Sequence, residues 1–214
     1  MLTLIEREFK DNLIFFLIAL IASMVCTSTV VWSVTMTHAD ALPVGIPLIM
    51  YQALAVLLPG LALLAAAFGA TQMYGDRSKR ISTFLSTLAT TRGQILAAKM
   101  ITGVLWILLV LLPLLAADVI LLQVYPRVAP LDVSFLAKMF AVTFLCSLAC
   151  YALGLQMGWN TNRFFPILGS VALSFTLIYL VVVKGFSIQA LGLLFVFAVA
   201  ALTRTWQRFM SIPI

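Results

Sequence analysis

The chain has very few charged residues. Only 9% of its 214 residues are Asp, Glu, Lys or Arg, whereas 64% are hydrophobic. A soluble domain carries about a quarter charged residues, so this chain has too few to cover a surface that faces water. We therefore expect an all-α integral membrane protein with a single domain, residues 1–214, that is solvated by lipid. Period-2 alternation of polar and apolar residues is also missing, which disfavours a β-barrel.

Residues that build catalytic and metal sites are scarce as well. The chain has one histidine, His38, which follows the first apolar run. Its three cysteines, Cys26, Cys146 and Cys150, all fall within apolar runs. There is no plausible Ser/His/Asp or Cys/His set, no set of metal ligands, and no G-x-x-x-x-G-K-[ST] motif for nucleotide phosphates. We therefore expect no catalytic, cofactor or metal site in this chain. The cysteines are expected to be small packing residues in helix interfaces.

What the chain does have is a series of long apolar runs. A helix needs about 20 residues to cross the ~30 Å of hydrocarbon in a bilayer. The expected spans lie near Leu13–Met36, Val44–Met73, Met100–Val124, Val133–Gly158, Phe164–Val183 and Ile188–Leu202. The sixth run is short, at roughly 15 residues. It is either a half-helix or the first part of a helix that continues through Thr203–Phe209, with Trp206 at the membrane interface.

The distribution of Lys and Arg predicts the orientation. If the N-terminus is inside, the cytoplasmic set is Arg7, Lys10, Arg77, Lys79, Arg80, Arg92, Lys99, Arg163, Arg204 and Arg208, and the outer set is Arg127, Lys138 and Lys184. This asymmetry follows the positive-inside rule and places both termini in the cytoplasm. The net charge of +6 then needs no nucleic-acid partner, because it reflects topology and attraction to anionic membrane lipid.

The longest polar interruption is Tyr74–Lys99. Within it, Ile81, Phe84, Leu85 and Leu88 follow the i, i+3, i+4, i+7 pattern of a helix with one apolar stripe. We expect this helix at about 77–89, with Asp76 as its N-cap. Such a helix either lies flat on the membrane or docks into the groove of a partner. Thr91 is the expected N-cap of the following span, in a capping box with Gln94. Ile95, Leu96 and Lys99 are then expected at the membrane face.

Two further features concern the interior of the bundle. Asp118 and Lys138 lie at comparable depth in the third and fourth spans, so they either form an ion pair or extend separately to the interface. The Gly154-x-x-x-Gly158 motif predicts close approach of two helices, either within the chain or at a dimer interface.

The order of motifs from about Leu57 to Trp106 resembles the permease subunit of ABC type 2 export transporters. The matching segments are GDRSKR, ISTFLSTLATT and RGQILAAK, in that order. The N-terminal IEREFKDN resembles the amphipathic elbow helix of that family, and SLACYALGLQMGWNTNR resembles its small-residue fourth span. The chain departs from the family at Asp76, where Glu is frequent, and at Ala89, where Pro is frequent. These departures leave the subfamily and the substrate open.

The resemblance implies six transmembrane helices, an N-terminal elbow helix and a coupling helix, in a bacterial or archaeal cytoplasmic membrane. It implies a second permease copy or paralogue and a separate ABC ATP-binding subunit, which holds ATP and Mg²⁺. It assigns Ile81, Phe84, Leu85 and Leu88 to the apolar contact with that subunit, and Asp76, Arg77 and Arg80 to its charged rim. The implied function is export of a lipophilic or amphiphilic substrate, with no enzymatic activity in this chain.

Two alternatives remain open at this point. One is a haem-exporter-type permease of cytochrome c maturation, which is a close relative of similar length. The other is a membrane scaffold or sensor whose polar loop docks a cytoplasmic signalling protein.

Overall fold

The computed structural model describes residues 2–40, 45–78, 92–124, 133–159 and 164–211. Within these ranges the chain is helical apart from short connections, and it contains no strand. The helices are α1 (Leu2–Asp11), α2 (Leu13–Asp40), α3 (Gly45–Ser78), α5 (Arg92–Val124), α6 (Val133–Trp159), α7 (Phe164–Lys184) and α8 (Ile188–Ser211). The predicted all-α class is confirmed.

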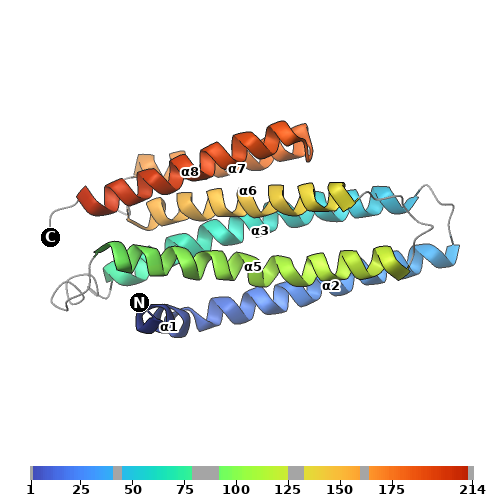
Figure 1. Cartoon of the computed structure of the whole chain (residues 1–214), viewed down its shortest axis with the longest axis horizontal. Helices are drawn as coiled ribbons and strands as arrows, with labels where there is room; N and C mark the ends of the chain where they lie inside the picture. Colours follow the sequence, from blue (N-terminus) through green and yellow to red (C-terminus); the bar gives the residue numbers. More distant parts are fainter. Residues whose placement is uncertain (1, 41–44, 79–91, 125–132, 160–163, 212–214) are drawn as a thin grey trace.

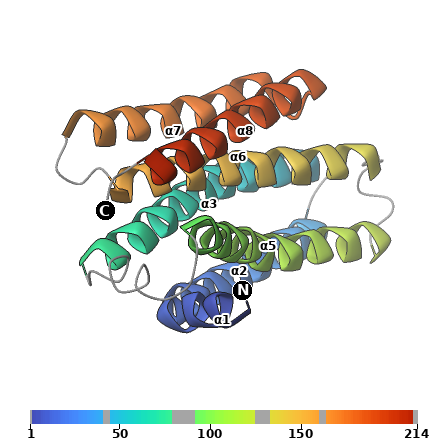
Figure 2. The same ribbon diagram turned by 60° about the vertical axis from the view of Figure 1, so that its left-hand side comes forward.

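The long helices run in alternating directions along the long axis of the molecule (Figure 1). The most extensive helix contact is between α3 and α6, which therefore form the centre. Helices α2 and α5 pack on one side of this pair, with the short α1 against α5, while α7 and α8 pack on the other side (Figure 2). The end of α3, the start of α5, α1 and the end of α8 all lie at one end of the bundle (Figure 1).

Several of these helices are long and apolar enough to cross a membrane. Within the described residues, the segments that meet this condition are Gly93–Ala117, Leu136–Gly158 and Ile188–Met210, with 25, 23 and 23 residues. Helices α1 and α2 add a fourth if they are taken as one span that bends by 62°. These are the helices expected of a membrane protein.

The structure decides one alternative and changes two helix boundaries. Helix α8 continues to Ser211, so the sixth apolar run belongs to a full-length helix. Helix α5 begins at Arg92, directly after the predicted cap and well before Met100. Helix α3 continues through Asp76 to Ser78, so the predicted N-cap role of Asp76 is wrong. No proline lies between Pro59 and Ser78, and the glycine at position 75 is tolerated within a helix.

Small residues allow the close contact between α3 and α6. A Cβ atom on Gly154 would collide with the carbonyl oxygen of Ala66, and one on Gly158 would collide with that of Ala70. On the facing helix, a Cβ on Gly69 would lie 2.5 Å from the carbonyl oxygen of Tyr151. The Gly-x-x-x-Gly motif is therefore used within the chain, which confirms the first of its two predicted uses.

The buried side chains form two hydrophobic cores. The first lies among α2, α3, α5 and α6 and is rich in aromatic residues. At its centre, the Phe68 ring stacks on Trp106 with centroids 5.1 Å apart and meets Phe16 edge-on at 6.1 Å. The second core lies among α3, α6, α7 and α8 and is mostly aliphatic. It includes Cys146 and Cys150 as free thiols, which confirms their predicted packing role; the Cys26 side chain lies outside the described part.

A tight connection joins α7 to α8. Gly185 adopts a φ of 64°, a left-handed conformation that glycine accepts without the steric penalty of a Cβ atom. Ser187 then caps α8, because its hydroxyl accepts a hydrogen bond from the Ala190 amide at 3.3 Å. These two residues fix the reversal that returns α8 along α6.

Candidate functional site

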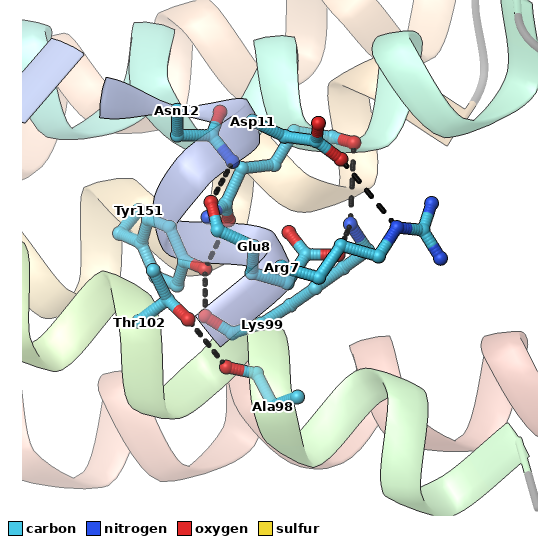
Figure 3. Close-up of polar contacts among 9 residues, drawn as sticks. Arg7, Glu8, Asp11, Asn12, Ala98, Lys99, Thr102 and Tyr151 are labelled. Atoms are coloured by element: carbon cyan, nitrogen blue, oxygen red, sulfur yellow. Dashed lines mark hydrogen bonds and ion pairs between the residues drawn. The ribbon is translucent and has the colours of Figure 1, made fainter. Parts of the chain in front are cut away.

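A polar cluster is buried where four helices meet. Its members are Glu8 from α1, Gln72 from α3, Lys99 from α5 and Tyr151 from α6, three of which Figure 3 labels. Counted as a whole residue, each of the four is at most 8% exposed. Gln72 and Lys99 lie within two helical turns of the ends of α3 and α5 that border residues 79–91. The cluster thus joins both helices that flank this polar segment.

The centre of the cluster is an ion pair. Lys99 Nζ lies 2.9 Å from Glu8 Oε1, and the two side chains are only 1% and 10% exposed. Nζ also donates to the Gln72 carbonyl oxygen at 3.4 Å. Removing a charge from water costs several kcal/mol, so a buried lysine persists only when it is paired and hydrogen-bonded. The contact from α1 is therefore a condition for Lys99 to be buried as a cation.

Tyr151 connects the same helices through its hydroxyl group. The oxygen lies 2.7 Å from Gln72 Oε1 and 2.8 Å from the Lys99 carbonyl oxygen. A hydroxyl has one proton and cannot donate to both acceptors. Gln72 Nε2, in contrast, is buried without a hydrogen-bond partner among the described residues. Exchanging the amide N and O lets Nε2 donate to the hydroxyl while the hydroxyl donates to Lys99, and we assign the amide this way.

Two glycines make room for Tyr151. A Cβ on Gly103 of α5 would collide with the phenol ring, and one on Gly69 of α3 would press on the backbone of Tyr151. The ring is fully buried and stacks at 6.1 Å from Phe68. The polar cluster is therefore continuous with the aromatic core, so its geometry is fixed by packing as well as by hydrogen bonds.

The bend between α1 and α2 is anchored next to the ion pair. Asn12 Nδ2 and the Asn12 amide both donate to the Glu8 carbonyl oxygen, at 2.8 and 3.2 Å. The Phe16 amide donates to the Asn12 carbonyl oxygen at 3.2 Å, which starts α2. Trp106 Nε1 of α5 then donates to the Phe15 carbonyl oxygen at 3.1 Å. These bonds hold the bend on the surface of α5.

The other charges of α1 point away from the bundle. Lys10 pairs with Glu6 at 2.8 Å and Arg7 with Asp11 at 3.6 Å (Figure 3 shows the second pair), both at i, i+4 spacing. The Lys10–Glu6 side chains are 71% and 66% exposed. Exposed pairs of this kind contribute little to stability. Of the acidic residues in α1, Glu8 is the one that is buried.

The site predicted from the sequence lies mostly outside the described residues. Asp76 and Arg77 lie in the last turn of α3, and the positions of their side chains are not described. The remaining predicted coupling residues, Arg80, Ile81, Phe84, Leu85 and Leu88, fall in the segment 79–91, which is outside the described part. The coupling helix at about 77–89 therefore stays a prediction beyond Ser78.

The proposed intramembrane pair also stays a prediction. Lys138 is exposed on the second turn of α6, and Asp118 lies within α5, but the Asp118 side chain is outside the described part.

The interpretation of Lys99 as a charge at the membrane face is wrong. Its ammonium group is buried and bound to Glu8, because α5 begins seven residues earlier and carries Lys99 into the bundle. One signal for this pair was present in the sequence. Spacing at i, i+4 gives every other charged residue of α1 a partner of opposite sign, whereas the positions four residues from Glu8 are the uncharged Leu4 and Asn12. For Gln72 and Tyr151, the sequence offers no signal beyond a polar group in an apolar run.

The chemistry of the cluster is that of a structural connection. Among the described residues, no group of three or more His, Cys, Asp and Glu is placed to hold a metal ion. The cluster provides one ion pair and directional hydrogen bonds that join α1, α3, α5 and α6. Comparison with known proteins identifies no relative, since no family model, curated protein or solved structure matches the chain.

Proposed function

We propose that the chain is the transmembrane subunit of an ATP-driven transporter of the ABC type 2 class, which exports a lipophilic or amphiphilic substrate. The observation that carries the proposal is the buried connection between α3 and α5, the two helices that border the polar segment 79–91. Gln72, Tyr151 and Lys99 bind these helices to each other and to α6. A force applied to the segment therefore acts on a rigid unit and not on two independent helices.

In the proposed topology, six helices cross the cytoplasmic membrane: α2, α3, α5, α6, α7 and α8. The elbow helix is α1, which lies at the cytoplasmic interface and meets α2 at 62°. The alternating direction of the long helices and the excess of Lys and Arg on one side support this arrangement. Both termini then lie in the cytoplasm.

The coupling helix at about 77–89 meets a groove on a separate ATP-binding subunit, which holds ATP and Mg²⁺. Phe84, Leu85 and Leu88 supply the apolar contact, and each contributes about 1.5–3 kcal/mol before ordering costs. Asp76, Arg77 and Arg80 belong to the charged rim and govern orientation more than affinity. Closure of the nucleotide-bound partner pushes this helix and, through α3 and α5, the bundle.

A second copy or a paralogue completes the transport path. The outward faces of α2, α7 and α8 are apolar, with Ile14, Tyr179 and Ile188 among their most exposed large side chains. These faces meet lipid or the second permease. A path bordered by such surfaces favours a lipophilic or amphiphilic substrate.

The first test is purification of the tagged chain in mild detergent, followed by identification of the proteins that remain bound. We expect a protein with the G-x-x-x-x-G-K-[ST] motif and ATPase activity. Capture of a kinase or protease in its place favours the scaffold alternative, and the absence of any ATP-hydrolysing companion rejects the transporter.

The second test is Phe84→Asp, which places a charge in the apolar contact. We expect association with the ATP-binding subunit to weaken at least about tenfold, since 1.4 kcal/mol corresponds to a factor of ten. Ser86→Asp is the matched control, because it adds the same charge to the opposite face of the predicted helix. Equal effects of the two variants on binding contradict the proposed contact.

A further inference from the structure

We propose that the Glu8–Lys99 ion pair is the joint that makes α1 and the start of α2 move together with the helices that border residues 79–91. The proposal rests on the proposed function and identifies two positioning residues for it. Neither residue lies in the predicted coupling helix, and both lie among the described residues.

The joint has one side on α5. Lys99 is almost completely buried, and its backbone carbonyl accepts the Tyr151 hydroxyl while its Nζ contacts the Gln72 carbonyl oxygen. Both ends of this residue are thus fixed to neighbouring helices. A displacement of α3 or α5 at this level carries the ammonium group with it.

The other side of the joint is on α1. Glu8 binds Lys99 through its side chain, and through its carbonyl oxygen it accepts both hydrogen bonds from Asn12 at the bend. The same residue therefore holds α1 to α5 and defines where α1 ends. A displacement of Glu8 therefore moves Asn12 at the bend, and Asn12 directly precedes the first residue of α2.

The burial of the pair makes it suited to this task. Charges screened by water and salt attract weakly at a distance, whereas a buried pair keeps its attraction at ordinary ionic strength. The other ion pairs of α1, Glu6–Lys10 and Arg7–Asp11, lie within α1 itself. They cannot transmit a displacement from α5, and the first of them provides a matched control.

The test uses hydrogen exchange of the backbone amides, measured on the chain in lipid nanodiscs. In the chain alone, we expect Glu8→Gln/Lys99→Met to raise the exchange rate of the α1 amides at least about tenfold, because the helix undocks more often. The double variant removes both charges, so no unpaired charge stays buried and the bundle keeps its fold. Glu6→Gln/Lys10→Met should leave the α1 rates unchanged. Equal α1 rates in the parent and the first double variant overturn the proposal.

The second measurement uses the complex with the ATP-binding subunit, compared with ADP and with ATP plus vanadate. We expect the nucleotide to change exchange in residues 79–91 of every variant, and in α1 of the parent and the control. In Glu8→Gln/Lys99→Met, the α1 response should be lost while the response of 79–91 is kept. Two outcomes contradict this proposal but leave the proposed function standing, provided that residues 79–91 respond to the nucleotide. In the first, α1 does not respond in the parent. In the second, α1 responds equally in all variants. If no companion binds or 79–91 never responds, the proposed function fails and the joint fails with it.

Discussion

The two cores of the bundle hold their helices by different means. In the first core, side chains bond from one helix to the backbone of another: Trp106 Nε1 reaches Phe15, and Ser23 Oγ of α2 donates to the Val110 carbonyl oxygen of α5 at 3.1 Å. On α6 and α7, which contribute to the second core, Thr143 and Ser174 donate to carbonyl oxygens of their own helices. Directional bonds specify one position, whereas apolar packing between smooth helices tolerates small shifts. The first core is therefore the better fixed of the two.

Polar contacts between helices also occur in the second half, where Thr205 Oγ1 of α8 lies 3.5 Å from the Ala152 carbonyl oxygen of α6. Gln156 Nε2 of α6 donates to the Ala201 carbonyl oxygen and to Thr205 Oγ1 of α8, at 3.1 Å each. It lies near the end of α6 that faces the start of α5, where Gly93 packs beside Trp206. Most of these bonds between helices thus lie toward the end of the bundle that borders residues 79–91, whereas the Ser23–Val110 bond lies near the middle of α5.

The largest effect is expected from Lys99→Met. The substitution leaves the Glu8 carboxylate buried without its cation, which costs about 3–5 kcal/mol of unfolding free energy. The measurement is unfolding in mixed micelles by titration with SDS. Lys10→Met, which breaks the exposed pair on the same helix, should stay within about 0.5 kcal/mol. Adding Glu8→Gln to Lys99→Met should recover most of the loss, and a larger loss in the double variant would contradict the ion pair.

Gly154→Ala tests the packing that joins the two cores. The new Cβ atom meets the backbone of Ala66, and backbone cannot yield as a side chain does, so we expect a loss of about 1–3 kcal/mol. Gly192→Ala is the control on α8, because nothing lies within 4 Å of its Cβ position. Alanine there should stabilise the helix by about 0.5–1 kcal/mol. Thermal midpoints in detergent should move in opposite directions, and shifts of the same sign would reject the close contact.

Tyr151→Phe tests the polar cluster without changing its shape. Loss of the hydroxyl removes the buried partner of the Gln72 amide and one of the bonds to the Lys99 carbonyl, for a cost of about 1–3 kcal/mol. Tyr179→Phe changes the same group on α7, where the side chain is 69% exposed, and should cost less than about 0.5 kcal/mol. The comparison is the difference in unfolding free energy between the two variants; equal values would mean that the hydroxyl of Tyr151 makes no useful bond.

The smallest effect compares one hydroxyl from each core. Ser23→Ala removes a bond between two helices and should cost about 0.5–1.5 kcal/mol. Thr143→Val removes a bond within one helix, where the Met139 carbonyl keeps its place in the helical ladder, and should be nearly neutral. The measurement is the change in unfolding free energy of each variant relative to the parent, obtained by titration with SDS. A greater loss for Thr143→Val would reverse the contrast between the cores.

The sequence predicts most of the fold because the apolar runs are long and uninterrupted. The span expected at Val133–Gly158 matches α6 to within one residue at its end, and that at Phe164–Val183 matches α7 equally well. Errors arise where polar residues continue a helix. A helix break is predicted at Asp76, yet α3 continues through it to Ser78, since polar residues without proline satisfy the helical hydrogen bonds as well as apolar ones do. At the other end of the polar segment, α5 begins at Arg92, directly after the cap predicted at Thr91.

The candidate site was less predictable for a physical reason. Charges were assigned to the two sides of the membrane by counting, and counting treats each one as hydrated. Lys99 breaks this assumption because its partner, Glu8, is 91 residues away and becomes adjacent only through the packing of α1 on α5. The role of Tyr151 depends on the absence of side chains at Gly69 and Gly103, which is visible only when three helices are placed together.

The long separation between Glu8 and Lys99 has a consequence for synthesis of the chain. A ribosome adds about 5–20 residues per second, so Glu8 is made roughly 5–18 seconds before the cation that neutralises it. In the proposed topology, the Glu8 carboxylate stays hydrated during that interval, which keeps α1 outside the hydrocarbon while α2 and α3 enter it. In that topology, docking of α1 is a late step of assembly, because it requires α5 to be in place.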